Sequence, residues 1–96
     1  MKGARVLPDT EGWLDEDQMK LPGAYGQPDE GEATADDGPD SPFRRWQITT
    51  PSGDRGALNP AKHQVIEHED GTITVKPSIV TDHWHGWLTR GDWISA

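Results

Sequence analysis

HQVIEHEDGTITVKPSI, residues 63–79, is the stretch from which the fold is best predicted. Two runs of alternating polar and apolar residues flank Asp70-Gly71, a pair typical of a two-residue hairpin with a type I′ turn. Such a turn pairs Glu67 with Thr74 on one face of the hairpin. The opposite, apolar face then carries Ile66, His68, Ile73 and Val75.

The residues next to this hairpin also indicate short strands. Pro77 is expected to end the second strand, because proline has no amide hydrogen to donate within a sheet. Upstream, FRRWQITT at residues 43–50 places Trp46 and Ile48 on one face of a strand. PSGDRG, which follows, is typical of a turn or loop.

The C-terminal end adds a second hairpin. WHGWL at residues 84–88 is expected to form a strand, and DWIS at residues 92–95 the returning one, with a turn at Arg90-Gly91. The predicted fold is therefore mainly β: a small antiparallel meander of four to six short strands. We place this β domain at residues 43–96 and a long, extended, irregular arm at residues 1–42.

The arm is predicted from charge and composition. The chain of 96 residues has a net charge of −8. Eleven acidic and three basic residues in positions 1–42 account for all of it. Residues 4–7 could form one short strand, and residues 11–21 a helical turn. Residues 22–42 are rich in proline, glycine and acids, a composition that buries too little apolar surface to order itself.

Composition also limits the class of protein. Only 31% of the residues are hydrophobic, so the core must be thin. There is no cysteine, which excludes disulfides and cysteine-type zinc sites. We expect no membrane span and no signal peptide, because no long apolar run is present. The acidic balance argues against direct binding to nucleic acid.

Three histidines form the candidate metal site. His83 and His85 are two residues apart, so on a strand they point to the same side and could share one ion. His68, on the apolar face of the hairpin, could supply a third ligand. Zinc is the cofactor that such a site would take; otherwise no cofactor is expected. The alternative is that His85 is hydrogen-bonded at the core edge and His83 is solvated.

Tryptophans and acidic residues are the candidate partner-binding residues. Trp84 and Trp87 have opposite strand parity, so one faces outward unless Gly86 forms a bulge. An exposed tryptophan would suit a protein interface, whereas a buried one would build the core. The residues proposed for partner binding are Trp13, Trp84, Trp87, Trp93, Asp36 and Asp37.

Catalysis has little support in the sequence. The serines lack the Gly-x-Ser-x-Gly elbow, and the glycines do not follow phosphate-loop patterns. We therefore expect a protein that is not an enzyme. Arg90-Gly91-Asp92 spells an integrin-type tripeptide, but Gly91 is already required by the predicted turn.

The C-terminal third resembles a small uncharacterised family found mostly in phages and prophages. The shared pattern is Pro77-Ser78-Ile79, then Trp84-His85-Gly86, then Gly91-x-Trp93. Many members carry a Cys-Pro-Cys-Gly cluster upstream and a cysteine before the histidine, which implies zinc binding in those members. None of these cysteines is present here. The resemblance implies a phage origin and a compact β unit without that metal.

These observations lead to one expected function and two alternatives. The first is a non-catalytic phage protein that binds other virion subunits, as a capsid-decorating or tail-associated accessory in the virion. The second is an acidic inhibitor of a host defence protein, acting in the host cytoplasm as a nucleic-acid mimic through residues 29–40. The third is a small metal-binding module built on His83, His85 and His68.

Overall fold

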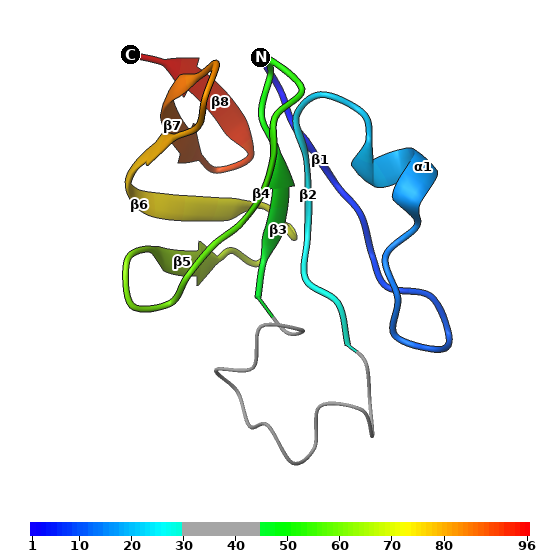
Figure 1. The fold of residues 1–96 in the computed structure, drawn as a ribbon. Coiled ribbons are helices and arrows are strands. Elements are labelled where there is room, and N and C mark those ends of the chain that lie inside the picture. The colour runs from blue at the N-terminus through cyan, green and yellow to red at the C-terminus, as the bar shows by residue number, and fades with distance from the viewer. Residues whose placement is uncertain (30–44) are drawn as a thin grey trace.

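The fold is mainly β, as the sequence predicts. In a computed structural model, which describes residues 1–29 and 45–96, the chain folds into two four-stranded sheets and one short helix (Figure 1). In these parts of the chain, no helix has the length and apolar character needed to cross a membrane. The elements are β1 (Ala4–Arg5), α1 (Glu16–Met19), β2 (Ala24–Gly26), β3 (Gln47–Thr49), β4 (Arg55–Ala57), β5 (Gln64–Glu67), β6 (Ile73–Val80), β7 (His85–Thr89) and β8 (Asp92–Ser95).

The two sheets differ in how local their pairing is. The order β5-β6-β7-β8 is an antiparallel meander in which every strand pairs with its neighbour in sequence. The order β1-β2-β3-β4 includes a parallel β1–β2 pair. It also includes an antiparallel β2–β3 pair across the undescribed residues. Of the eight strands in the described residues, six lie in residues 45–96, within the four to six predicted for the β domain.

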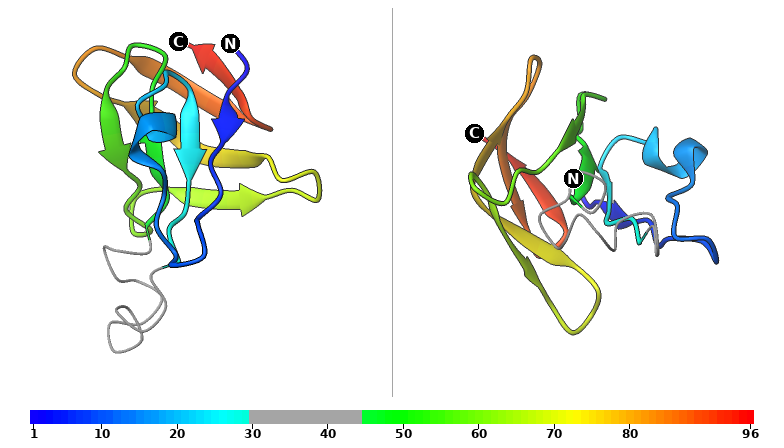
Figure 2. Two further views of the ribbon diagram at one scale, coloured as in Figure 1. Left: turned by 90° about the vertical axis from the view of Figure 1, so that its right-hand side faces the viewer. Right: turned by 60° about the horizontal axis from the view of Figure 1, so that its bottom comes forward.

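The core lies between the two sheets. Figure 2 shows the arrangement of the sheets from two further directions. Side chains from both sheets form one buried cluster, and Trp46 and Ile48 lie in it as predicted from their alternation. A smaller cluster lies under α1. The main cluster consists of Tyr25, Trp46, Ile48, Leu58, Ile73, Val75, Ile79, Leu88 and Trp93, and the smaller one of Val6, Met19 and Ala24.

The N-terminal residues join the two sheets. Lys2 forms a β-bridge with Asp92 of β8, and the amide of Gly3 donates to the Gly91 carbonyl at 2.7 Å. Inside this crossing, the indole Nε1 of Trp93 donates to the Gly23 carbonyl at 2.9 Å. Trp93 is 3% exposed, so this hydrogen bond satisfies a polar atom that is shut off from water.

The prediction of an arm at residues 1–42 is not met in its described part. Residues 1–29 provide β1, α1 and β2, and the side chains of Met19 and Tyr25 are fully buried. α1 lies within the helical turn predicted at residues 11–21, and the Asp15 carboxylate accepts from the amides of Asp17 and Gln18 at its start. These short segments show no regular alternation of polar and apolar residues. Their order comes from packing on β3, which is distant in sequence. Residues 30–42 lie outside the described residues.

The predicted register of the central hairpin is wrong by one residue. Ile66 pairs with Thr74, so Val65 and not Ile66 packs against the core. The loop has three residues: the His68 amide donates to the Thr72 carbonyl at 2.9 Å, and Gly71 has a φ of 86°. A three-residue loop with a left-handed glycine is the next hairpin class after the two-residue turn. A shift of one residue exchanges the two faces of the strand.

Pro77 does not end its strand, which is a second correction. β6 continues through Pro77 to Val80, and its pairing with β7 shifts between Val75 and Ile79. Proline is tolerated because it lies in a bulge, where a regular ladder hydrogen bond is not required. The C-terminal hairpin is as predicted: Thr89 pairs with Asp92 across Arg90-Gly91, and both turn residues have positive φ.

The crossing at Gly3 gives a first prediction. A Cβ atom at Gly3 would lie 2.6 Å from the Gly23 oxygen and 2.7 Å from Trp93 Nε1. We expect Gly3→Ala to lower the free energy of unfolding by about 1–3 kcal/mol, because neither neighbour is a flexible side-chain end. Urea denaturation followed by tryptophan fluorescence measures it.

Gly56→Ala is the matched control for this experiment. The nearest atom to its Cβ is Ile48 Cγ1 at 3.9 Å, which is ordinary contact. We expect its free energy of unfolding to stay within about 0.5 kcal/mol of the parent. Equal losses in the two variants would show that the crossing does not constrain the fold.

Candidate functional site

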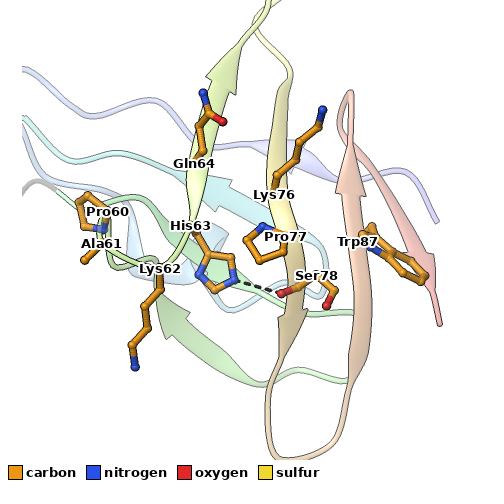
Figure 3. Close-up of a pocket in the computed structure, with 9 residues that line it drawn as sticks. All are labelled: Pro60, Ala61, Lys62, His63, Gln64, Lys76, Pro77, Ser78 and Trp87. Atoms are coloured by element: carbon orange, nitrogen blue, oxygen red, sulfur yellow. Dashed lines mark hydrogen bonds between the residues drawn. The ribbon is translucent and has the colours of Figure 1, made fainter.

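A groove lies on the outer face of the β5–β8 sheet. Its volume is about 830 Å³, within the range of roughly 300–1,000 Å³ that is usual for small-molecule sites. Figure 3 shows that its lining side chains come from three strands and from the loop before β5. They are Pro60, Ala61, Lys62, His63, Gln64, Lys76, Pro77, Ser78 and Trp87.

The groove is built by the bulge in β6. Val75 pairs with Leu88 and Ile79 with Gly86, so the three residues 76–78 lie opposite Trp87 alone. Two extra residues are therefore accommodated on β6. A bulge redirects side chains that a regular strand would alternate between faces. Here it brings Lys76, Pro77 and Ser78 to the groove beside Trp87.

Two histidines hold the bulge at Ser78. His63 Nε2 lies 3.1 Å from the Ser78 carbonyl oxygen, which can only accept, so this nitrogen carries the hydrogen. His85 Nε2 lies 3.3 Å from the Ser78 hydroxyl. The His85 ring also lies beside the Trp87 indole, with centroids 6.1 Å apart and planes tilted by 35°. The groove thus has an aromatic side on β7 and an imidazole on the opposite side.

The charge of the groove is opposite to that of the chain. Its lining holds Lys62 and Lys76, and no aspartate or glutamate is among the described residues that line it. Two adjoining hollows share Pro60 with it and add Arg45, again with no acidic lining residue. Hollows elsewhere on the described surface are lined by acids such as Asp29. A local basic surface therefore exists on a chain of net charge −8.

An apolar stripe runs beside the groove on the same outer face. Val80 pairs with His85, and Trp87 pairs with Ile94, so these four side chains occupy adjacent positions on β6, β7 and β8. Val80 is 68% exposed, Trp87 42% and Ile94 48%. We call Val80, Trp87 and Ile94 the docking stripe.

The predicted partner-binding tryptophans divide into three kinds. Trp87 is exposed on the docking stripe, and Trp13 is exposed in the loop before α1. Trp93 is a core residue, so its assignment to a partner surface was wrong: its indole is buried and hydrogen-bonded. Trp84 is half-buried and meets Trp93 edge to face at 5.3 Å. Asp36 and Asp37 lie outside the described residues.

Gly86 does not form the bulge that was considered for it. Trp84 precedes β7 and packs over this glycine: a Cβ there would lie 2.5 Å from the Trp84 ring and 2.1 Å from the Ile94 oxygen. Position 86 therefore has no room for a side chain, because the Trp84 indole covers it. The bulge that shapes the face lies across the ladder, in β6.

The three candidate metal-ligating histidines are not brought together. His83 Nδ1 lies 2.9 Å from Asp54, His68 Nε2 lies 2.6 Å from the Thr74 hydroxyl, and His85 faces Ser78. In residues 1–29 and 45–96, no three histidine, aspartate or glutamate side chains are arranged to hold a metal ion. The histidines instead fasten loops and strands to one another.

Asp54 and His83 form a polar clamp between the two sheets. The Asp54 carboxylate, in the β3–β4 turn, accepts from the Thr81 hydroxyl at 2.7 Å and from the His83 amide at 2.7 Å. Hydrogen bonds from Thr81 and His83 lower the pKa of Asp54 from 3.8 to about 2. The hydrogen bond to Asp54 and its negative charge raise the pKa of His83 above 6.5.

Sequence reasoning missed Lys62, His63, Lys76 and Ser78 as groove residues. The available signal was Pro77 within an otherwise continuous strand pattern, because proline inside a sheet marks an edge or a bulge. The position of His63 depends on a loop whose path the sequence does not indicate. Comparison with protein-family models, curated proteins and solved structures found no match. The resemblance of the C-terminal third to a phage family stays a prediction.

The clamp predicts a pH window for stability. Asp54 stabilises the fold above its unfolded pKa of 3.8, and this contribution is lost as the pH falls through about 2. His83 stabilises the fold below 6.5, and this contribution is lost as the pH rises through its raised pKa. The stability difference between the parent and Asp54→Asn should therefore be largest between about pH 4 and pH 6.5.

Urea denaturation at a series of pH values measures this difference. Glu69→Gln, which also removes one negative charge from an exposed position, serves as the control. Because the His83 side chain is 74% exposed, added salt should shrink the difference. A difference that does not vary with pH would show that the clamp contributes no charge-dependent stability.

Proposed function

We propose that the chain is a non-catalytic binding protein that docks on a protein partner through the docking stripe. The observation that carries this proposal is the exposure of Val80, Trp87 and Ile94 at adjacent positions on three neighbouring strands. Large apolar side chains gathered on one face mark interaction sites, and tryptophan is enriched among residues that dominate binding energy.

The openness of this face favours binding over catalysis. The Ser78 hydroxyl lies near His85 Nε2, which is the pairing that a nucleophile and its base would use. His85 is exposed, Ser78 is half-buried, and the neighbouring Trp87 is 42% exposed, so water reaches this pair. Enzymes exclude water to strengthen electrostatic stabilisation of their transition states. This surface therefore suits recognition.

The partner that we propose is another subunit of a phage particle, with the chain as a capsid-decorating or tail-associated accessory. The phage resemblance of the C-terminal third supports this choice. The docking stripe supports it too, because Trp87 and Ile94 lie on β7 and β8, the strands that contain His85-Gly86 and Trp93 of the shared pattern. A subunit that adds to an assembled particle needs one exposed face for attachment and a core that is complete without the particle.

Mass spectrometry of particles purified from the host strain that encodes the chain tests this proposal. We expect the chain at many copies per particle, at a constant ratio to the major structural subunit across a density gradient. Its absence from particles, while it is present in the lysate of the same cells, would remove the virion role.

Variants of the stripe test whether it is the contact surface. We expect Trp87→Ser combined with Ile94→Ser to lower incorporation at least tenfold, because hot-spot losses of about 2 kcal/mol or more are usual for buried aromatic anchors. Leu7→Ser combined with Leu21→Ser is the matched control, since it removes exposed apolar residues elsewhere on the chain. Incorporation that survives the stripe variant would place the contact on another surface.

A further inference from the structure

We propose that the groove at the β6 bulge binds a nucleoside phosphate, with the base stacked on Trp87 and the phosphate held by Lys76. This proposal shares Trp87 with the protein contact proposed above but rests on different observations and does not depend on it. It is carried by three observations: the charge of the lining, the aromatic platform beside it, and the geometry of the bulge.

Charge selects an anion. Of the described residues that line the groove, two are lysines and none is acidic, and the adjoining hollows add Arg45. The six acids of residues 43–96 lie at other positions on the described surface. Charges farther away than about 8–10 Å are largely screened at physiological ionic strength. The lysines that line the groove carry positive charge, although the whole chain is acidic.

The aromatic side selects a flat ring. Trp87 is 42% exposed, and the tilted His85 ring beside it extends the flat surface along β7. No hydrogen bond of the described residues fixes the Trp87 indole nitrogen, in contrast to that of Trp93. An exposed indole face stacks nucleic-acid bases with little dependence on their sequence. A ligand that carries only charge would leave this surface unused.

The bulge places ring and charge within reach of each other. Lys76 belongs to the bulge that lies opposite Trp87, on the strand directly beside β7, and neighbouring strands are about 5 Å apart. Figure 3 shows Lys76 and Lys62 pointing to opposite ends of the groove, with His63 and Pro77 between them. A base on Trp87 thus directs its ribose over Pro77 and its phosphate toward Lys76.

Polar atoms between the lysines suit the sugar. His63 donates its Nε2 hydrogen to the Ser78 carbonyl, so Nδ1 is the remaining polar atom of the ring and an acceptor in the neutral form. Gln64 also lines this stretch of the groove. Together they offer an acceptor and an amide to ribose hydroxyls. The floor is apolar where Pro60 and Pro77 lie, as in most small-molecule sites.

Calorimetry and NMR titration of the full chain with adenosine monophosphate test the proposal. We expect a Kd on the order of 0.1 mM, because the groove is open, with the largest amide shifts at residues 76–78 and 87. Adenosine alone and inorganic phosphate alone should each bind at least tenfold more weakly. A 5′-phosphorylated hexadeoxyadenylate distinguishes the source: tighter binding than the monophosphate assigns a single strand, and equal binding assigns the free nucleotide.

Matched variants separate stacking from charge. Trp87→Ala should weaken binding about tenfold at any salt concentration, because it removes the stacking surface. Lys76→Gln should weaken binding severalfold and flatten its salt dependence. Trp13→Ala and Lys20→Gln, an exposed tryptophan and an exposed lysine outside the groove, should leave the Kd unchanged.

Three results would overturn the proposal. The first is absence of saturable binding by both the monophosphate and the hexanucleotide. The second is a Kd that neither Trp87→Ala nor Lys76→Gln changes. The third is binding of hexaglutamate or inorganic phosphate as tight as that of the nucleotide, which would make the groove a general anion site. Because all four substituted side chains are exposed, the variants should keep the fold, which the NMR spectrum checks directly.

Discussion

The packing of Trp93 against the N-terminal crossing is the constraint on which the rest of the structure depends. Its indole fills the space between the sheets and needs an acceptor there, and the Gly23 carbonyl is that acceptor. A buried donor left unpaired costs about 1–3 kcal/mol. Gly3 must lie within contact of both partners, which excludes any side chain at that position. Trp93, near the C-terminus, thereby constrains the backbone at Gly3 and at Gly23.

This arrangement determines which face of the β5–β8 sheet remains exposed for binding. Val75, Ile79 and Leu88 turn inward toward Trp93 and the first sheet, and all are buried. Within residues 1–29 and 45–96 no further layer covers the opposite face, so alternate residues of β6, β7 and β8 are exposed. The docking stripe and the groove are therefore consequences of the alternation that builds the core. The bulge decides which polar residues join them.

Sequence reasoning succeeded where structure depends on near neighbours. The alternation of Trp46 and Ile48 and the Arg90-Gly91 turn could be predicted because each requires only local chemistry. The central register was missed because two hairpin classes share Asp70-Gly71 and differ by one loop residue. β1 lies within the short strand considered for residues 4–7, but β2 was missed because its order comes from pairing with residues distant in sequence. The groove was missed for the same reason: Lys62, His63 and Trp87 meet only after the sheet has formed.

Trp87 belongs both to the docking stripe and to the wall of the groove, so the two proposed binding events share one side chain. An indole face covered by a base cannot pack against a protein, and burial under a protein removes the stacking surface. Linkage then requires each ligand to weaken the other by the same factor, whichever binds first. If both sites operate, a nucleotide would release this subunit from its partner. Only a contact that left the indole face open would uncouple them.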